Sequence, residues 1–565
     1  MVALEKWLIT SAWPYSSVTP HLGNMVGSIL SGDVIARYLR LKGREVLYVS
    51  GSDEHGTPVE VEALKAKLSV KEFADKNHNK IKELFERWEI SYDNYTRTEN
   101  PTHIEFVQDF YLKLQKNGYV YESTEKVHYC DKDRRFLPDR FVEGECPFCG
   151  FKNARGDQCD GCGRPIEPES LINPICVICH SPVHLKETKQ WFFDLPKLEG
   201  EIKAYLTSKS IHLSDIARSF SLKLVDEGLK PRSLTRDSKW GIPAPFEGAQ
   251  GKTIYVWMEA VLGYVSATIE YFKKTGNPTG WRAFWFEKDT KSAYFIGKDN
   301  IPFHTLILPG LLLGTREGYN LPSVVDSTDF LMFEGQKFSK SRRIGIWIDE
   351  ALEIAPADYW RYTLLSLRPE GGDVNFKLDS FIEKVNNDLN NVVGNLVNRT
   401  VVSFEKFCGS ELEAKPKLDE DSEKFIESFL KRHDEISSLY ESFKIQRAVR
   451  TTILQGEEGN RFLNEKEPWK LFKTNREKAV SVTYSLLRLI RLLAVELYPI
   501  TPATSETLWK NMNEQEPILS FGWDRAKEDF SYPLRIQRFP PLFKKLSREE
   551  VISKLEELRG GGRVG

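Results

Sequence analysis

The sequence predicts an α/β protein whose parallel sheet is interrupted by an insertion and followed by an all-α helical bundle. Three observations predict this fold: two strand–helix–strand patterns, a cluster of seven of the eight cysteines between Cys130 and Cys179, and helical periodicity after Asp358. The length of 565 residues also exceeds what one hydrophobic core usually serves. We therefore expect several structural units.

The first strand–helix–strand pattern lies near the amino terminus. Short apolar runs rich in β-forming residues at 7–12 (WLITSA) and 45–50 (EVLYVS) predict strands, and apolar spacing over 23–42 predicts the helix between them. The second pattern consists of a strand at 293–297, a helix over about 302–313 and a strand at 323–327. Both patterns are typical of βαβ units, which form parallel sheets.

The segment between these patterns is rich in Cys, Gly, Pro and Asp, which predicts a metal-stabilised insertion. After it, the carboxyl half follows a helical pattern. Apolar residues recur at helical spacing over 381–404, 421–443, 445–454 and 477–497. Stripes of this kind are typical of buried helix faces, so the sequence predicts an antiparallel helical bundle.

Two CxxC motifs give the strongest local pattern. Four thiolates at this spacing can converge on one tetrahedral Zn²⁺, and they leave no position open for a substrate, so we expect a structural zinc site. Its ligands would be Cys146, Cys149, Cys159 and Cys162. Three further cysteines suggest a second site that is one ligand short: Cys130, Cys176 and Cys179, with Asp133, His128 or His180 as the candidate fourth ligand.

Two other motifs are suited to binding phosphates. PYSSVTPHLGN (14–24) joins the first strand to the first helix, where helix-end amides and His21 can meet a phosphate. KFSKS (337–341) places Lys337 and Lys340 three residues apart, in a loop that can fold over a polyphosphate. Taken singly, the first motif is more typical of a structural histidine, and the second is typical of a solvated surface turn.

Together, and in this order, the two motifs resemble the HIGH and KMSKS signatures of class I aminoacyl-tRNA synthetases. Asn24 stands where a second His is usual, and Phe338 stands where Met is usual. Segments along nearly the whole chain further resemble the methionyl-tRNA synthetase family: SAWPYSS, SGSDEHGTP, YVWMEAVLGY, YFIGKDNIPFH, GNLVNR and NEKEPW.

This resemblance implies a split Rossmann-like catalytic core with a zinc-binding connective insertion and an α-helical anticodon-binding domain. The implied bounds are 1–114 and 232–325 for the two halves of the core, 115–231 for the insertion, 326–380 for the KFSKS-loop and stem-contact region, 381–545 for the anticodon-binding domain and 546–565 for a C-terminal helix and tail.

The resemblance also implies a two-step reaction, in which ATP activates L-methionine to methionyl-adenylate and the acyl group is then transferred to the 3′ end of tRNA(Met). No covalent enzyme intermediate is needed, so positioning and electrostatic stabilisation would dominate. The implied catalytic residues are His21, Asn24, Lys337 and Lys340. ATP, accompanied by Mg²⁺, would contact the same four residues together with Gly23, Gly297 and Asp299.

Methionine is best selected by an aromatic pocket, because sulfur near ring edges is favourable. The implied pocket consists of Ala12, Trp13, Tyr15, Asp53, Trp257, Ala260, Tyr264 and His304, with Asp53 holding the ammonium group. Without the resemblance, Trp257 and Tyr264 would be interpreted as ordinary core.

Anticodon bases need ring faces and polar donors. The implied anticodon-binding residues are Asn395, Arg399 and Trp469, of which the first two lie four apart on one helix face. The alternative interpretation is a helix-packing Asn, a surface Arg and a buried Trp.

Composition limits the other functional classes. The net charge is −2, from 79 basic and 81 acidic residues, so charge alone does not indicate a nucleic-acid partner. Glu5 and nearby aromatic residues do not resemble a secretory leader, and charges within 481–499 argue against a membrane span. The cysteine pattern suits a reducing compartment, so we expect a cytoplasmic protein.

Several alternatives explain part of the sequence. Isoleucyl, valyl and leucyl enzymes usually carry a larger editing insertion, and a cysteinyl enzyme would place a thiolate where this chain has Ser11. A small nucleotidyltransferase would not explain the bundle, and a non-catalytic tRNA-binding paralogue would not need both KFSKS and Asp53. The expected partners are tRNA(Met), ATP and L-methionine, and we expect a monomer, with a separate tRNA-binding protein as a candidate partner.

Overall fold

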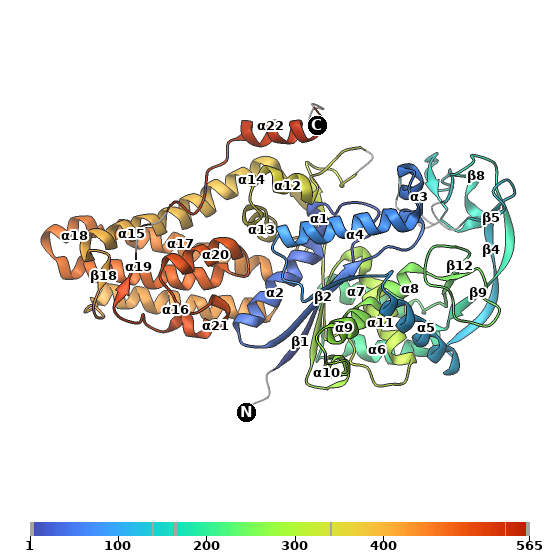
Figure 1. Cartoon of the computed structure of the whole chain (residues 1–565), viewed down its shortest axis with the longest axis horizontal. Coiled ribbons are helices and arrows are strands. Elements are labelled where there is room, and N and C mark those ends of the chain that lie inside the picture. The colour runs from blue at the N-terminus through green and yellow to red at the C-terminus, as the bar shows by residue number, and fades with distance from the viewer. Residues whose placement is uncertain are drawn as a thin grey trace.

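The structure is a computed structural model of the chain, and it describes residues 5–137, 141–156, 159, 161–162, 166–339, 342–536, 538 and 540–560. The molecule is elongated, with an α/β half at one end and a helical half at the other (Figure 1). In the described part of the chain, no helix is both long and apolar enough to cross a membrane.

One six-stranded parallel sheet forms the centre of the α/β half. Its strand order is β10–β15–β14–β1–β2–β3. The strands are β1 (Lys6–Ser11), β2 (Glu45–Ser52), β3 (Asn94–Arg97), β10 (His212–Leu213), β14 (Lys291–Gly297) and β15 (Val324–Thr328). Because β1 lies between β2 and β14, the two predicted strand–helix–strand patterns join in one sheet. The predicted fold class is confirmed.

Helices cover both faces of this sheet. Leu8 and Ile9, adjacent in β1, point to opposite faces and are fully buried in two different hydrophobic clusters. The cluster around Leu8 includes α5 (Pro101–Lys116) and α9 (Gly263–Lys274). The cluster around Ile9 includes α2 (Leu30–Leu41) and continues into the helical half. One face of the sheet therefore shares its core with the bundle.

A buried ion pair lies where the two halves meet. Arg361, on α13 (Ala357–Ser366), contacts Asp33 on α2 at 2.6 Å and donates to the backbone carbonyl of Ile500 at 2.9 Å. Burial opposes the ionisation of Asp33, but Arg37 and Arg361 outweigh it and hold the pKa of Asp33 below its ordinary value. The junction is thus fixed by charge as well as by apolar packing.

The insertion is built on two long antiparallel strands, β4 (Val120–Cys130) and β9 (His184–Phe193). Between them in sequence lie β6 (Val142–Glu145), β7 (Ala154–Arg155) and β8 (Ile172–Cys176), which form a separate small sheet. Its core is a cluster of cysteines and a few apolar side chains. The predicted range 115–231 also contains α6 (Glu199–Thr207), β10 and α7 (Asp215–Asp226), in this order along the chain. Strand β10 pairs with β15 and so belongs to the main sheet.

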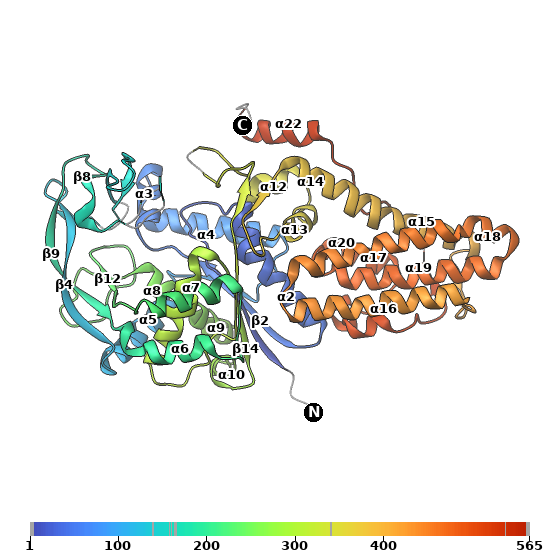
Figure 2. The ribbon, with the colours of Figure 1, turned by 180° about the vertical axis from the view of Figure 1, so that it is seen from behind.

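The helical half contains the predicted bundle. Its main helices are α15 (Asn395–Cys408), α16 (Glu420–Glu441), α17 (Ile445–Lys466), α18 (Pro468–Thr474), α19 (Arg476–Leu497) and α20 (Pro502–Asn511). Helix α19 is buried along nearly its whole length, because α15, α16 and α17 surround it. The last helix, α22 (Arg548–Leu558), returns to the α/β half and packs on α12 (Ile348–Ile354), as both views show (Figures 1 and 2).

Candidate active site

His21 caps the helix α1 (Leu22–Asn24), which follows the first strand. Its Nδ1 accepts hydrogen bonds from the backbone amides of Gly23 (3.1 Å) and Asn24 (3.3 Å), and the Asn24 Oδ1 accepts one from the His21 amide (3.0 Å). Burial lowers the pKa of His21 to about 4, so the ring is neutral at pH 7. Since Nδ1 is an acceptor, the proton lies on Nε2, which is therefore a donor.

The KFSKS segment lies directly against this cap. Phe338 stacks on the His21 ring, with centroids 4.3 Å apart and planes 10° from parallel. Gly345 has a φ of 126°, and a Cβ added there would overlap Phe338, so a glycine is required at this turn. The backbone amide of Leu22 also donates to the carbonyl of Ile346 at 3.1 Å. The structure thus brings the two sequence motifs together.

Only one of the two predicted lysines can be placed. Lys337 is exposed, and its Nζ lies 5.3 Å from the ring centroid of Phe330. Lys340 lies outside the described residues. Gly297 ends β14, and a Cβ there would lie 2.7 Å from a carboxylate oxygen of Asp299. Gly297 is thus the carboxyl end of β14, Asp299 follows it, and His21 follows β1. The strand order reverses between β14 and β1, and such sheets bind ligands at this position.

The predicted methionine-pocket residues form an aromatic group beside the same sheet edge. Trp13 meets Tyr264 edge to face at 6.3 Å, and Tyr15 meets Trp257 in the same way at 5.7 Å. The Tyr264 hydroxyl donates to Nε2 of His304 at 2.8 Å, while His304 Nδ1 donates to the carbonyl of Asn300. The predicted pocket also includes two alanines. The amide of Ala12 donates to the backbone carbonyl of Phe295, and Ala260 is buried.

Two glycines make room for Trp13. A Cβ on Gly51 or on Gly263 would come within 2.8 Å of the Trp13 ring. Such a distance is far below ordinary contact, so neither position accepts a side chain while Trp13 keeps its place.

Asp53 follows β2 and is tied to the loop that carries the aromatic residues. Its amide donates to the carbonyl of Pro14 (2.9 Å), and its carbonyl accepts from the amide of Ser16 (2.7 Å). The side chain is 3% exposed, and its Oδ1 has no hydrogen-bond partner among the described residues. Burial, with the nearby Glu259 carboxylate, raises the pKa of Asp53 well above its ordinary value. A cationic ligand could donate a hydrogen bond to this Oδ1 atom and stabilise the ionised carboxylate.

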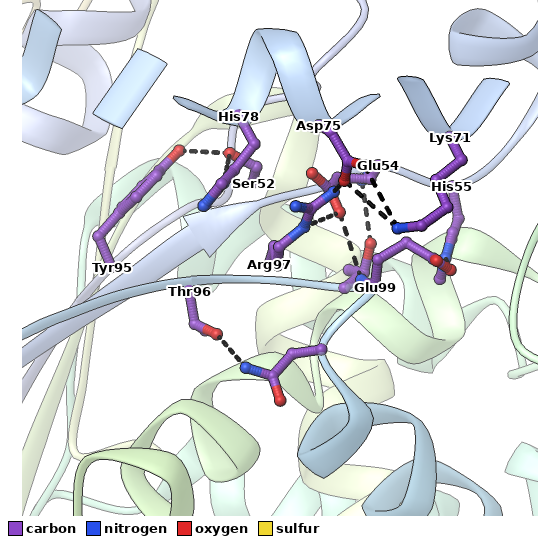
Figure 3. Close-up of polar contacts among 12 residues, drawn as sticks. Ser52, Glu54, His55, Lys71, Asp75, His78, Tyr95, Thr96, Arg97 and Glu99 are labelled. Atoms are coloured by element: carbon purple, nitrogen blue, oxygen red, sulfur yellow. Dashed lines mark hydrogen bonds and ion pairs between the residues drawn. The ribbon is translucent and has the colours of Figure 1, made fainter. Parts of the chain in front are cut away.

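A polar network that the sequence did not predict includes Glu54 and His55, the two residues that follow Asp53 (Figure 3). Arg97 donates to Glu54 at 2.7 Å, and His55 lies 2.8 Å from Glu99. The other ring nitrogen of His55 contacts Glu259. The only sequence signal was that His55 falls within SGSDEHGTP, a segment noted for its family resemblance.

The insertion holds two clusters with metal-ligand chemistry. Cys146, Cys149, Cys159 and Cys162 bring four sulfur atoms within 4.8 Å of one another. The second cluster consists of Cys130, Asp133, Cys176 and Cys179. Of the three candidate fourth ligands, Asp133 joins this cluster, with Oδ2 3.0 Å from the Cys176 sulfur. Backbone amides point at several of the sulfur atoms, and all eight cysteines are free, so both donor sets fit Zn²⁺.

The three predicted anticodon-binding residues also lie together. The guanidinium carbon of Arg399 lies 5.3 Å from the ring centroid of Trp469, and Arg399 donates to Asn464 at 2.8 Å. Asn395 and Arg399 line a hollow of about 640 Å³ between α15 and α17. Its other lining residues are Asn391, Val392, Glu457, Asn460, Arg461, Asn464 and Glu465. The hollow thus offers amide and guanidinium groups beside a ring face.

The chain is similar to known proteins along nearly its whole length. Residues 7–401 match the family described as tRNA synthetases class I (M), and residues 414–561 match the anticodon binding domain of methionyl tRNA ligase. The methionine–tRNA ligase of Thermofilum pendens is 51% identical, over 99% of this chain and 98% of that protein. The methionine–tRNA ligase of Korarchaeum cryptofilum is 48% identical, over 99% of each.

A solved structure has the same fold. Mycobacterium tuberculosis methionyl-tRNA synthetase in complex with methionyl-adenylate superposes with a TM-score of 0.79 at 21% identity, over 96% of this chain and 100% of that chain. The two family matches and the full-length relatives lead to one conclusion: the chain belongs to the methionyl-tRNA synthetase family of class I aminoacyl-tRNA synthetases.

Proposed function

We propose that the chain activates L-methionine with ATP and transfers the methionyl group to the 3′ end of tRNA(Met). The observation that carries this proposal is the position of Asp53: a buried carboxylate with a free oxygen, tied by its backbone to the aromatic loop. A carboxylate beside aromatic rings, next to a phosphate-binding turn, suits an α-amino acid with an uncharged side chain.

In the first step, the methionine carboxylate attacks the α-phosphate of ATP, giving methionyl-adenylate and pyrophosphate. ATP would enter with Mg²⁺, which would supply positive charge to its phosphates. The Nε2–H of His21 would donate to the phosphates, while the amides of Gly23 and Asn24 hold the ring in place by donating to its Nδ1. Lys337 and Lys340 supply the positive charge, and Gly297 and Asp299 lie against the nucleotide.

The side chain of methionine is selected by shape. Trp13, Tyr15, Trp257 and Tyr264 present ring edges and faces, which favour a thioether sulfur. His304 fixes the orientation of the Tyr264 hydroxyl, because its Nε2 accepts a hydrogen bond from that hydroxyl. Burial lowers the pKa of His304 to about 4, so the ring stays neutral. Ala12 and Ala260 leave the volume that the side chain needs.

In the second step, a terminal ribose hydroxyl of tRNA(Met) takes the methionyl group and AMP leaves. Asn395, Arg399 and Trp469 would read the anticodon, with Trp469 stacking on a base and the polar groups meeting base edges. Residues 326–380 would contact the tRNA stem, between the 3′ end and the anticodon. The other domain bounds expected from the sequence are part of the same proposal.

Zinc in both cysteine clusters is also part of this proposal. The Cys₄ set would be a closed structural site, and the Cys₃Asp set would use Asp133 as its oxygen ligand. Each ion would hold its part of the insertion together, because the core there is small. We further propose a monomeric cytoplasmic enzyme, with a separate tRNA-binding protein as a candidate partner.

Amino-acid-dependent ATP–pyrophosphate exchange tests the proposed function. We expect exchange with methionine and much less with leucine, isoleucine, valine or cysteine, together with charging of tRNA(Met) by the same preparation. A chain that binds tRNA(Met) but supports no exchange would instead be a non-catalytic tRNA-binding paralogue.

A further inference from the structure

His55 lies two residues beyond Asp53, between two carboxylates. Its ring is 1% exposed; Nε2 lies 2.8 Å from a carboxylate oxygen of Glu99, and Nδ1 contacts Glu259 (Figure 3 shows His55 beside Glu99). Burial raises the pKa of Glu259, and the contact with His55 lowers it. When both carboxylates are ionised they only accept hydrogen bonds, so both ring nitrogens then donate. A ring that donates from both nitrogens is an imidazolium. The geometry therefore indicates a buried positive charge behind the Asp53 loop.

This charge connects three segments that border the proposed methionine pocket. His55 belongs to the loop after β2, Glu99 follows β3, and Glu259 lies on α8 (Val256–Ala260). Helix α8 also carries Trp257 and Ala260 of the pocket. The two contacts of His55 thus fix one wall of the pocket against the loop that holds Asp53.

The charged groups around His55 come from several elements. On its own loop are Asp53 and Glu54; the β3 segment adds Arg97 and Glu99, and α8 adds Glu259. The carboxylate of Glu54 is already paired with Arg97 at 2.7 Å, and Arg97 also contacts Asp75. His103, on α5, faces the same region, but burial lowers its pKa to about 3, so it stays neutral.

The charges act on Asp53 in opposite directions. The Glu259 carboxylate raises the pKa of Asp53 further above the level set by burial, and the His55 imidazolium lowers it. Burial alone would lower the pKa of His55, but Glu259 and Glu99 outweigh it and raise that pKa to about 10. His55 therefore stays charged through neutral pH and favours the ionised form of Asp53.

We propose that His55 is a positioning residue for methionine: held between Glu99 and Glu259, its imidazolium favours the ionised form of Asp53 and fixes α8 beside it. The inference rests on the proposed function, in which Asp53 holds the methionine ammonium group. According to this inference, His55 lies outside the pocket but affects the binding of methionine, and it has little effect on the binding of ATP.

The variant His55→Gln tests this role by pyrophosphate exchange with the full chain. Without the imidazolium, the Glu259 carboxylate faces Asp53 unopposed, so Asp53 takes up a proton at a higher pH. We expect KM for methionine to rise about tenfold and the acid limb of kcat/KM for methionine to move up by about one pH unit, since one pKa unit corresponds to a tenfold change. KM for ATP should change by less than about twofold, because neither contact of His55 reaches the His21 turn.

His78→Gln is the matched control. His78 is also buried and lies close to the same loop, where its Nδ1 is 3.0 Å from the Ser52 hydroxyl (Figure 3). Burial, with Arg97 and Lys82 nearby, lowers its pKa to about 4, so it is neutral and its loss removes no charge. We expect the acid limb of this variant to coincide with that of the unmodified chain.

The double variant His55→Gln/Glu259→Gln provides a repair test. It removes the carboxylate that opposes ionisation of Asp53, so the KM for methionine and the acid limb should return toward their original values. The inference is overturned if His55→Gln raises the two KM values by the same factor, leaves the acid limb in place, or is not improved by Glu259→Gln.

A measurement on the unmodified chain covers the case in which the variants do not fold. With ¹⁵N-labelled histidine, NMR should find both nitrogens of His55 protonated at pH 8. His433, whose ring nitrogens lie 2.8 Å from Glu496 and 3.1 Å from the carbonyl of Trp523, can give a similar signal, which His433→Gln in the helical half identifies. A neutral His55 would overturn the inference. An unmodified chain without methionine-dependent exchange would instead contradict the proposed function, so the two failures are distinguishable.

Discussion

His21 and Phe338 stack face to face, with ring centroids 4.3 Å apart, although they belong to motifs at opposite ends of the catalytic half. The contact explains how a Phe can stand in a loop where Met is usual in the family. An aromatic ring covers the face of the neutral imidazole, and such stacking does not engage the Nε2–H, which lies in the plane of the ring. The stacking thus fixes the orientation of the histidine, which we propose donates to the phosphates, and couples its position to the KFSKS loop.

Replacing Phe338 by Ala should therefore weaken the first step. Loss of an aromatic pair costs about 0.5–1.5 kcal/mol, so we expect kcat/KM for ATP to fall by about two- to tenfold in pyrophosphate exchange. Phe338→Met should retain most of the activity, because a long apolar side chain can still cover the ring. Equal activity of the Ala variant and the unmodified chain would show that the stacking does not orient His21.

Replacing Asp53 by Asn should separate stability from function. The pKa of Asp53 in the folded chain is raised above its unfolded value, so its contribution to stability is present at low pH and is lost as pH rises through the folded pKa. Neutral pH lies above the unfolded pKa, so the carboxyl group is destabilising there, and Asn removes this cost. We expect the midpoint of thermal unfolding to rise by about 1–3 °C.

The same variant should bind methionine poorly. Removing one partner of a buried charge pair costs about 2–5 kcal/mol, so KM for methionine should rise by about thirtyfold or more. Pyrophosphate exchange at saturating ATP measures this change, and calorimetry measures the unfolding midpoint. A variant with a lower midpoint and an unchanged KM would contradict both the assigned charge and the assigned role of Asp53.

Replacing Trp469 by Ala should affect tRNA and spare methionine activation. Stacking of a base on an aromatic ring contributes about 1–3 kcal/mol, so kcat/KM for tRNA(Met) in charging should fall by about 5- to 150-fold. Exchange with methionine should stay within experimental error, because Trp469 lies in the helical half (Figure 1, α18). Trp281→Ala, on α10 (Trp281–Phe286) of the α/β half, is the control that should leave charging unchanged. Equal loss of charging and exchange in Trp469→Ala would contradict the anticodon role.

Two zinc ions per chain are expected in the purified protein. Cys149→Ser removes one of four thiolates of the first cluster and Asp133→Ala removes the oxygen ligand of the second, so each should release about one ion. Metal analysis of the two variants and of the double variant measures this. A single ion in the unmodified chain, lost in only one of the variants, would leave the other cluster without a metal role.

The regular elements near the active site were largely predictable, because β-branched apolar runs and helical spacing are local signals. Helix α17 was predicted to end at 454, yet it continues to Lys466. Gly456 and Gly459 lower the helix propensity there, but a Cβ on Gly459 would lie 2.7 Å from Leu396 and Leu489. These glycines permit close helix packing, and tertiary contact outweighs propensity. Strand β10 was not predicted, because two residues are too few to show the alternation of apolar and polar side chains that indicates a strand.

The candidate site was predictable where a motif carries it and unpredictable where charge partners are distant in sequence. The residues of both signatures, the aromatic pocket and the first cysteine cluster were named from sequence. His55 was not, because its partners Glu99 and Glu259 lie 44 and 204 positions away. For the same reason, the pairing of Arg361 with Asp33, across 328 positions, leaves no trace in local spacing.

The close contact of Trp13 with Gly51 and Gly263 limits how these three positions can evolve. Gly51 and Gly263 come from distant parts of the chain, and each lies against the same indole. A lineage that acquires a side chain at either glycine must first give up the tryptophan, and a lineage that regains the tryptophan must first restore both glycines. The three positions should therefore change in a fixed order during evolution, so that ancestral sequences reconstructed at one of them constrain the other two.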